Sequence, residues 1–305
     1  VTDRCNMRCV YCMPEDVKFF PDNELLTYKE IERIAGLGAS MGITKIRLTG
    51  GEPLAREGIE TLVSGLKTIE GLKELSLTTN GLLLERYAPR LAGAGLDRVN
   101  VSLDTLDAEK FKKICRAGDI EDVISGIQAA GRAGLSPIKV NVVVMRGRND
   151  NEVADFVDFA VRENVSVRFI EFMPFTRDED WRSRFVSREE IMESARVKYE
   201  LTEQTNGNPS EPARYFKVGG AEAYIGFISP VSHGFCSMCN RLRLTADGVL
   251  LGCLREKSGL NLKYILRNGA TDEEVSAAFR IAVAAKSSHG RFDNLGERPM
   301  HKIGG

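Results

Sequence analysis

The cysteines constrain this chain more than any other residue type, because six of the seven fall into two tight groups and only Cys115 stands alone. The first group is a C-x3-C-x2-C motif formed by Cys5, Cys9 and Cys12, and the second is a C-x2-C-x13-C motif formed by Cys236, Cys239 and Cys253. An odd count with this clustering argues against a secreted disulfide framework. It indicates metal binding in a reducing compartment, so we expect a cytoplasmic protein.

Composition excludes several classes of protein. The 305 residues are 43% apolar and 28% charged, which is ordinary usage for a folded protein and argues against intrinsic disorder. The formal net charge is -1, and a protein that coats nucleic acid would carry a basic excess. No apolar run reaches the roughly 18 residues that span a bilayer, and no secretory signal is visible. We expect neither nucleic acid nor a membrane among the partners.

Apolar β-branched runs alternate with segments of helical periodicity through the first part of the chain. The expected strands are Lys45–Thr49, Glu74–Thr79, Arg98–Leu103, Ile138–Val144 and Val167–Glu171. The expected helices include Thr27–Met41, with a capping box of Thr27 and Glu30, and Asn151–Asn164. This alternation predicts an α/β fold with parallel pairing, a partial (βα)6 TIM-like barrel. Val140–Val144 suits a strand that is buried on both faces.

The two ends of the chain differ from this pattern. Val1–Thr2 has the character of a strand remnant, so we expect the first barrel strand to lie mostly before residue 1. The alternation weakens after about Trp181, and Thr205–Pro212 is rich in turn formers. Short strands are expected at Ala223–Ile228, Arg241–Thr245 and Val249–Cys253, followed by a helix at Asp272–Ala285. We expect a barrel over residues 1–184 and a β-rich C-terminal extension over residues 185–305.

Each cysteine trio can hold a metal centre from a short stretch of chain. A [4Fe–4S] cluster ordinarily takes four cysteines, so three local ligands leave one iron open to a cofactor or substrate. Zinc is the alternative at both sites. At the first trio a fourth ligand would come from elsewhere in the chain, and at the second trio His233 lies nearby in the sequence and would complete a Cys3His site.

Basic residues on or beside the predicted strands form a third pattern. An arginine or lysine that points into a barrel is costly unless it meets an anion. Any one of them would ordinarily pair with an acid or with solvent. Together they suit a triphosphate, because arginine grips phosphate with two hydrogen bonds and lysine supplies a point charge. The set is Arg47, Lys139, Arg168, Arg241 and Arg243.

The first motif, with an aromatic residue before its last cysteine, resembles the signature of radical S-adenosylmethionine (SAM) enzymes, and Gly50-Gly51-Glu52-Pro53 resembles their GGEP motif. The segment Phe235–Gly248 with Gly252-Cys253-Leu254 resembles the GTP 3′,8-cyclase family, known as molybdenum cofactor biosynthesis protein A. Further matching blocks cover nearly the whole chain: Thr2–Cys5, Tyr11–Pro14, Lys45–Pro53, Thr78–Gly81, Asn100–Asp104, Val140–Val144, Arg168–Pro174 and Gly304-Gly305.

The resemblance implies the residues of the site. Cys5, Cys9 and Cys12 would hold the cluster that binds SAM, and Cys236, Cys239 and Cys253 would hold the cluster that binds GTP. SAM would contact Tyr11, Gly51, Ser102 and Met173, with Gly50 and Glu52 beside them. GTP would contact Arg47, Thr78, Lys139, Arg241, Leu242 and Arg243, with Arg168 as a further candidate. In the family the tail that matches Gly304-Gly305 enters the active site, and only glycine fits where backbone passes close to a ligand.

The resemblance also implies the chemistry and the partners. SAM is cleaved to a 5′-deoxyadenosyl radical that removes hydrogen from C3′ of GTP, and the carbon radical then attacks C8. An electron donor such as flavodoxin, a downstream cyclic pyranopterin monophosphate synthase and a second copy of the chain are the implied protein partners. A family arginine that contacts GTP lies just upstream of the first motif, and we expect it to precede Val1.

Two rival interpretations stay open. One is a radical SAM enzyme with an auxiliary cluster that modifies a peptide or a tRNA. The arginines of Arg241-Leu242-Arg243 favour GTP over this rival, and the near-neutral charge disfavours tRNA. The other rival is a non-catalytic zinc-binding module.

Overall fold

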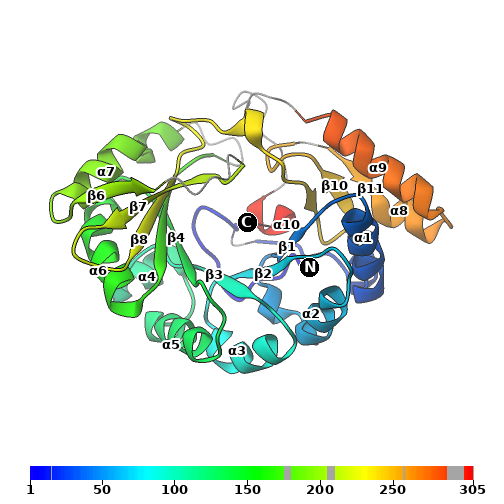
Figure 1. Cartoon of the computed structure of the whole chain (residues 1–305), viewed down its shortest axis with the longest axis horizontal. Coiled ribbons are helices and arrows are strands. Elements are labelled where there is room, and N and C mark those ends of the chain that lie inside the picture. Colours follow the sequence, from blue (N-terminus) through cyan, green and yellow to red (C-terminus); the bar gives the residue numbers. More distant parts are fainter. Residues whose placement is uncertain (15, 175–179, 205–209, 257, 287–298, 305) are drawn as a thin grey trace.

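A computed structural model describes residues 1–14, 16–174, 180–204, 210–256, 258–286 and 299–304. Its main element is an eight-stranded sheet with the order β1-β2-β3-β4-β5-β8-β7-β6. Figure 1 shows this sheet as an open arc with helices along its convex side. The predicted fold, an α/β partial barrel that does not close, is therefore confirmed.

Six strands of the arc run parallel, and the last two are antiparallel. The parallel strands are β1 (Lys45–Leu48), β2 (Glu74–Thr79), β3 (Arg98–Ser102), β4 (Lys139–Val144), β5 (Ser166–Glu171) and β8 (Tyr224–Ile228). The antiparallel strands are β7 (Ala213–Val218) and β6 (Leu201–Gln204). The predicted strands of the barrel are thus present, with ends that differ by one residue or less.

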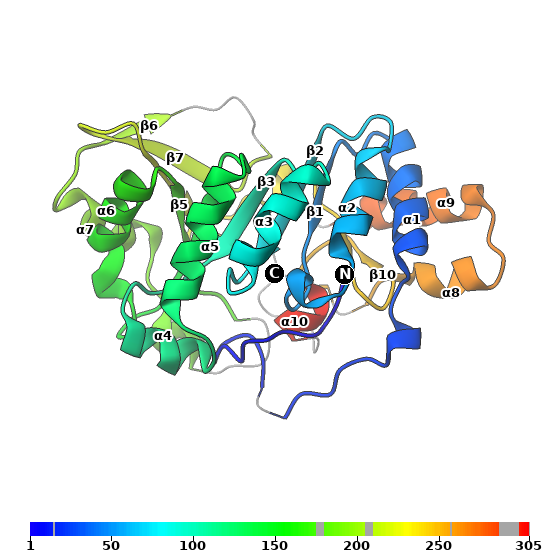
Figure 2. The same cartoon turned by 90° about the horizontal axis from the view of Figure 1, so that it is seen from below.

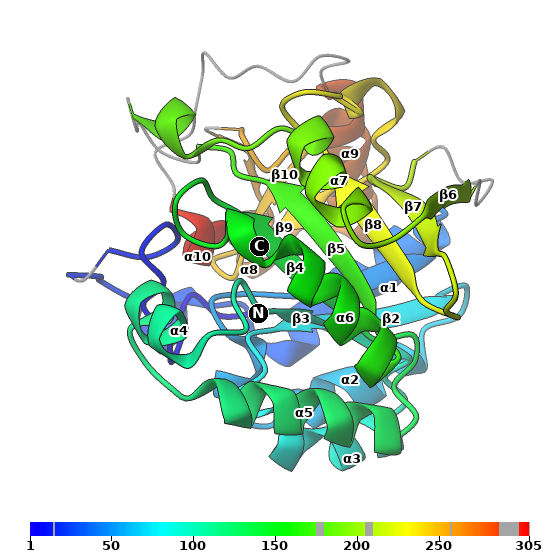
Figure 3. The same cartoon turned by 90° about the vertical axis from the view of Figure 1, so that its left-hand side faces the viewer.

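The helices of the barrel cover the outer face of the sheet. They are α1 (Tyr28–Ser40), α2 (Ile59–Lys67), α3 (Leu84–Gly93), α4 (Ala108–Cys115), α5 (Ile120–Arg132), α6 (Val153–Glu163) and α7 (Arg188–Arg196). Short 3-10 turns lie at Asp22–Glu24, Pro53–Ala55, Asp150–Glu152, Trp181–Arg184 and Cys236–Met238. Figure 3 shows α5, α6 and α7 on the outer side of the arc. The predicted capping box of Thr27 and Glu30 begins α1.

The strands alternate between a buried apolar face and a polar inner face. In β4, Val140, Val142 and Val144 are buried, whereas Asn141 and Val143 are only half-buried. The expectation that Val140–Val144 is buried on both faces is therefore wrong. The buried set packs under the outer helices in one large core, and the other set faces the concave side of the arc.

The described residues of the C-terminal part add a small antiparallel sheet and three helices. Its elements are β9 (Arg243–Leu244), β10 (Val249–Leu251), β11 (Leu260–Asn261), α8 (Leu262–Arg267), α9 (Asp272–Ala284) and α10 (Met300–Ile303). A turn at Asp247 and Gly248 joins β9 to β10, and Gly248 has the left-handed φ of 86° that glycine favours. Helix α9 packs against α1 through a separate apolar cluster that includes Ile34, Val275 and Phe279.

Several expected features differ in detail. Val1–Thr2 is not a strand, although the amide of Gly51 donates to Thr2 O at 2.7 Å. The strands β6 and β7 were not predicted, since β6 is mostly exposed and both flank a turn-rich segment. Residues 205–209 of that segment, and Gly305, lie outside the described residues. Among the described residues, none of the helices combines the length and apolarity needed to cross a membrane.

Candidate active site

The first cysteine motif lies on a loop that is fastened to the end of α4. The amides of Arg8 and Val10 donate to the carbonyls of Cys115 and Ile114, both at 3.0 Å. Cys5, Cys9 and Cys12 are half-buried free thiols. The lone Cys115 is buried beneath this loop, and its thiol hydrogen-bonds to Cys9. The seventh cysteine therefore belongs to the support of the first trio.

The segment just before Cys5 runs against the glycine pair that follows β1. The amide of Glu52 donates to Arg4 O at 2.7 Å. A β-carbon on Gly50 would lie 2.4 Å from Thr2 O, and one on Gly51 would lie 2.4 Å from Arg4 O. These glycines are therefore required by the close passage of residues 2–4, in addition to the contact with SAM that the resemblance implies.

A buried carboxylate joins the same glycine motif to Cys5. Glu52 is fully buried and accepts hydrogen bonds from the Thr79 hydroxyl at 2.8 Å and the Asn80 amide at 2.7 Å. The Asn80 side chain then donates to Cys5 Sγ at 3.7 Å and to Asn6 Oδ1 at 2.7 Å. Burial raises the pKa of Glu52 to about 7. Glu52 thus positions the turn after β2 that contacts the first trio.

A second buried carboxylate positions Tyr11. The Tyr11 hydroxyl donates to Asp104 Oδ2 at 2.6 Å, and the other oxygen of Asp104 accepts from the amide of Val143 at 2.9 Å. Burial raises the pKa of Asp104 to about 6. Ser102 ends β3 two residues before Asp104, and Met173 follows β5, so both lie at the carboxyl end of the sheet.

The electrostatic surroundings of the first trio favour neutral thiols in the absence of metal. Burial raises the pKa of Cys5 to about 11 and raises that of Cys12 further. The pKa of Cys9 is raised by its hydrogen bond with Cys115 and by burial. Thiolates at these positions therefore need a bound cation to offset desolvation, which is what a cluster iron supplies.

The second trio has a different environment. Cys236, Cys239 and Cys253 are half-buried free thiols. The Arg241 guanidinium donates twice to Cys239 Sγ, each at 3.4 Å, and Arg255 donates to Cys236 Sγ at 3.6 Å. Burial acts to raise the pKa of Cys239, but hydrogen bonds from the backbone and side chain of Arg241 outweigh it, and the pKa is lowered. Cationic donors thus favour the thiolate here.

His233 is not placed as a zinc ligand of the second trio. Its ring is exposed, and Nε2 lies 2.6 Å from Glu189 Oε1. Among the described residues, no group of three histidine, cysteine or acidic side chains converges on a single metal ion. A four-iron cluster takes its thiolates on separate iron atoms, so it does not require three cysteines to converge on one point as a zinc ion does.

The inner face of the sheet carries rows of polar side chains. Residues paired on neighbouring strands point to the same face, so the register defines these rows. They are Arg47 with Ser76 and Arg98, Thr78 with Asn100 and Lys139, and Ser102 with Asn141 and Arg168. Arg168 is 4% exposed and donates to Asn100 Oδ1 and Asn141 Oδ1, both at 2.9 Å.

Positive charge is concentrated on this face. Arg47 makes no hydrogen bond or ion pair with the described residues, and its pKa is lowered to about 9 by desolvation and by the charges of Arg168, Arg98 and Arg243. Lys139 donates to the Tyr215 hydroxyl at 2.9 Å and lies 3.4 Å from Glu211. Desolvation lowers its pKa to about 8. Such a set of cations favours binding of a polyanion.

The C-terminal tail joins the two parts of the site. Figures 1 and 2 place α10 inside the arc, next to the N-terminal segment. The Arg243 guanidinium donates to Gly304 O, and a β-carbon on Gly304 would lie 2.3 Å from Thr49 Oγ1. His301 is 1% exposed, and its backbone lies beside Cys12. Contacts therefore run from Arg243, which the charges of Cys239 and Cys253 influence, through Gly304 to Thr49 at the start of the glycine motif.

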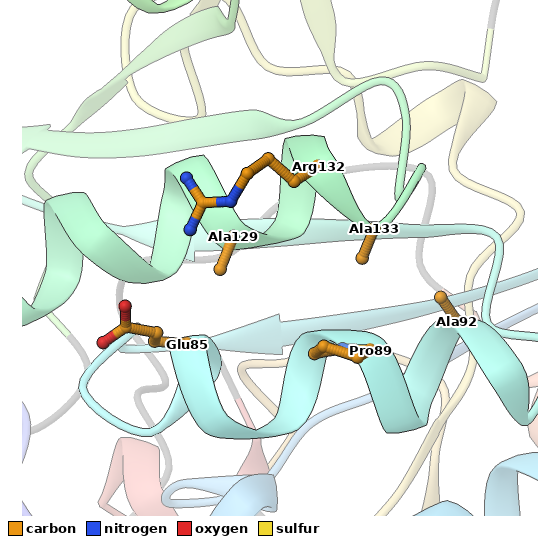
Figure 4. Close-up of a pocket in the computed structure, with 6 residues that line it drawn as sticks. All are labelled: Glu85, Pro89, Ala92, Ala129, Arg132 and Ala133. Atoms are coloured by element: carbon orange, nitrogen blue, oxygen red, sulfur yellow. The ribbon is translucent and has the colours of Figure 1, made fainter.

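A separate hollow lies on the outside of the barrel. It has a volume of about 410 Å3 and lies between α3 and α5 (Figure 4). Its wall is formed by Ala92, Ala129 and Ala133 together with Glu85, Pro89 and Arg132. It is on the opposite face of the sheet from the polar rows, and none of the predicted site residues lines it.

Comparison with known proteins identifies the family. Residues 1–160 match the Radical SAM superfamily, and residues 165–292 match Molybdenum Cofactor Synthesis C. The GTP 3′,8-cyclase of Thermodesulfovibrio yellowstonii is 45% identical over 307 residues, which cover 100% of this chain and 95% of that protein. The chain belongs to the GTP 3′,8-cyclase family. Another member, from Heliobacterium modesticaldum, is 46% identical over 312 residues, again with 100% and 95% coverage.

A solved structure supports the fold alone. Streptococcus suis SuiB bound to SAM superposes with a TM-score of 0.62 at 14% identity, covering 90% of this chain and 66% of that one. Family membership confirms the predicted enzyme class and the predicted cofactors, two [4Fe–4S] clusters and SAM. The cysteine surroundings described above fit those clusters.

Sequence reasoning missed several residues that support the site. Asn80, Asp104 and Lys286 contact the predicted residues from distant parts of the chain. The charge of Arg98 acts on Arg47, and the His301 backbone lies beside Cys12. Asn80 and Asp104 fall within blocks that carry the family resemblance, so their positions were a usable signal. Nothing local in the sequence distinguishes Arg98 or Lys286 from surface cations.

Proposed function

We propose that the chain converts GTP to (8S)-3′,8-cyclo-7,8-dihydroguanosine 5′-triphosphate in molybdenum cofactor biosynthesis. The observation that carries this proposal is the C-terminal tail, where Gly304 accepts from Arg243 and lies against Thr49 before the glycine motif, with a cationic face beside the two cysteine trios. The donors to Cys5 Sγ in the first trio are neutral, whereas the donors to Cys236 Sγ and Cys239 Sγ in the second are cationic, as expected for centres with different ligands. Family membership along the full chain supports the same substrate.

The residues have distinct roles in this proposal. Cys5, Cys9 and Cys12 hold the first cluster, and Cys236, Cys239 and Cys253 hold the second. When bound, the first cluster and SAM would supply the radical chemistry for removal of hydrogen at C3′ of GTP and closure of the C3′–C8 bond, and a further electron and a proton would be needed to give the 7,8-dihydro product. Tyr11, Gly51, Ser102 and Met173 bind SAM, and Gly50 and Glu52 keep the loop in place for it.

The cations bind the triphosphate and hold the ribose near the first trio. Arg47, Lys139, Arg241 and Arg243 contribute charge, and Thr78 and the Leu242 backbone contribute hydrogen bonds. The free guanidinium of Arg47 and the low pKa of Lys139, about 8, are both consistent with a site that awaits an anion. Arg168 shapes the face through its asparagine contacts, and the tail residues Gly304 and Gly305 close the site.

The wider context is also part of the proposal. Flavodoxin or a similar protein supplies the electron, a cyclic pyranopterin monophosphate synthase consumes the product, and the chain acts in the cytoplasm. The cysteine groups support a reducing compartment. Residues 1–184 form the radical-generating part and residues 185–305 carry the second cluster. The strands β6, β7 and β8 of the second part extend the sheet of the first.

The test is anaerobic incubation of the reconstituted protein with GTP, SAM and dithionite. We expect 5′-deoxyadenosine and a cyclised GTP product. Cys253→Ser should keep some SAM cleavage and lose the cyclised product. Product formation by Cys253→Ser at the wild-type rate would contradict the role of the second trio, and tRNA binding without GTP binding would favour the rival radical enzyme.

A further inference from the structure

The hydrogen bonds that reach the cysteine sulfurs differ in charge between the two trios. Among the described residues, Cys5 Sγ accepts from neutral donors, the Met7 amide at 3.4 Å and the Asn80 side chain at 3.7 Å. In the second trio, the sulfurs of Cys236 and Cys239 accept hydrogen bonds from cationic side chains. Two of these cations, Arg241 and Arg255, lie within two residues of a cysteine of the trio, but Lys286 is 33 residues beyond Cys253 and needs a separate explanation.

Lys286 connects the two chain segments that carry the second trio. Its ammonium donates to Arg241 O at 2.8 Å, to Gly252 O at 2.6 Å and to Cys239 Sγ at 3.8 Å. Arg241 follows Cys239 by two residues, and Gly252 directly precedes Cys253. The ammonium therefore uses all three of its N–H donors at once. Its acceptors lie at both ends of the 13-residue interval that separates Cys239 from Cys253.

The chain around Lys286 holds it in this place. Lys286 directly follows Ala285, the C-cap residue of α9. Helix α9 packs on α1 through buried Val275 and Phe279. A β-carbon on Gly252 would lie 3.2 Å from Lys286 Cγ and 3.0 Å from Ala282 O. The backbone before Cys253 thus passes close to the end of α9, and glycine at position 252 leaves room for the lysine stem.

We propose that Lys286 is a positioning residue of the second cluster that fixes the spacing of Cys239 and Cys253 and raises the reduction potential of the cluster. Reduction adds negative charge to a cluster, and a cation hydrogen-bonded to a ligand sulfur stabilises that charge, so the potential rises. The inference rests on the proposed function, because it requires a cluster at the second trio.

The experiment compares Lys286→Met and Lys286→Arg with Lys217→Met. Met keeps the length and apolar stem of lysine without its charge, Arg keeps the charge, and Lys217 is an exposed lysine of β7 paired with Glu222. The full-length chain with both clusters reconstituted is titrated with reductant under argon, and the reduced clusters are followed by electron paramagnetic resonance. The first cluster in each sample is the internal reference.

In Lys286→Met we expect the midpoint potential of the second cluster to shift to a more negative value, while that of the first cluster stays at its wild-type value. Iron at the second trio should be lost to a chelator about 10-fold faster, and Lys286→Arg should fall between Met and wild type. Loss of the second cluster from the Met variant alone also supports the positioning role.

A second-cluster potential and iron retention in Lys286→Met that match those of Lys217→Met would overturn the inference. Wild-type protein that holds iron at the first trio only would instead overturn the proposed function itself. Thermal unfolding of the metal-free variants shows whether the chain still folds, and the Arg variant keeps the test decisive if the Met variant is unstable.

Discussion

Substitution of Gly51 by alanine tests whether the glycine pair sets the position of the first trio. In the structure the amide of Gly51 donates to Thr2 O and that of Glu52 to Arg4 O, both at 2.7 Å. The new β-carbon would lie 2.4 Å from Arg4 O and 2.7 Å from both Arg4 C and Asp3 O. All of these neighbours are backbone atoms, so no side chain can rotate away to relieve the clash.

The size of the effect follows from these distances. Carbon and oxygen atoms in ordinary contact lie about 3.5 Å apart, so residues 3 and 4 must retreat by about 1 Å. Overpacking of this kind costs about 1–3 kcal/mol, and each weakened backbone hydrogen bond adds about 1 kcal/mol. Cys5 follows Arg4 directly, and a functional site tolerates displacements of only about 0.5 Å. We therefore expect loss of the first cluster in addition to lower stability.

The assay measures iron and sulfide per chain, 5′-deoxyadenosine formation from SAM, and the melting temperature of the metal-free protein. Gly51→Ala should lose about half of its iron, most of its SAM cleavage and about 5 °C or more of melting temperature. The matched control is Gly36→Ala in α1, where a β-carbon would meet nothing within 4 Å. That control should be neutral or slightly stabilising, because alanine favours a helix. Iron content and SAM cleavage in Gly51→Ala equal to those of Gly36→Ala would refute the reasoning.

Three further predictions concern the cationic face, the buried carboxylate and the tail. Arg47→Met should leave the metal-free protein at least as stable as the wild type, because it removes a cation that lies near Arg168, Arg98 and Arg243, and it should weaken GTP binding about 10- to 100-fold. Calorimetry of unfolding and of GTP binding measures the two effects, and unchanged GTP affinity would argue against a phosphate contact. Burial raises the pKa of Glu52 from 4.5 to about 7, so its contribution to stability is complete below pH 4.5 and is lost as the pH rises through 7. Urea denaturation of the metal-free wild type should therefore show a loss of about 3 kcal/mol between pH 4.5 and pH 8 relative to Glu52→Gln, and parallel pH profiles would contradict the assigned pKa. Gly304→Ala should displace the tail, because Gly304 has a φ of 85° and the new β-carbon would clash with Thr49 Oγ1. We therefore expect iron in both trios but little cyclised product, and full product formation would show that the tail position is not needed.

Much of the fold could be predicted because its signals are local. Strand alternation and helical periodicity located β1 to β5, and the Thr27 capping box began α1 as expected. The cysteine spacing likewise indicated two metal centres without any structural information. Where the prediction for β4 was wrong, apolar content was mistaken for burial: Val143 is apolar, yet it alternates to the inner face with Asn141.

The family blocks drew attention to Asn80 and Asp104, but the pairings that support the site could not be predicted, because they depend on contacts between distant segments. Asn80 reaches Cys5 across 75 residues, Tyr11 reaches Asp104 across 93, and Lys286 reaches Cys239 across 47. None of these residues forms a local pattern with its partner, and each type is common on protein surfaces. Such pairs become visible only when the register of the sheet and the packing of α9 are known.

The two trios differ in a way that suits different ligands. At the first trio, burial raises the pKa of Cys5 and Cys12, and the hydrogen bond with Cys115 and burial raise that of Cys9. The neutral donors to Cys5 lower its pKa but do not outweigh burial, so iron must supply the remaining compensation for thiolate charge. At the second trio, Arg241 and Lys286 already supply cationic charge, and the pKa of Cys239 is lowered before any metal binds. The second centre can therefore take iron with less desolvation penalty, and its surrounding cations can also meet an anionic substrate. The same charges would oppose the approach of a cationic sulfonium such as SAM, which agrees with the proposal that SAM binds at the first trio and GTP at the second.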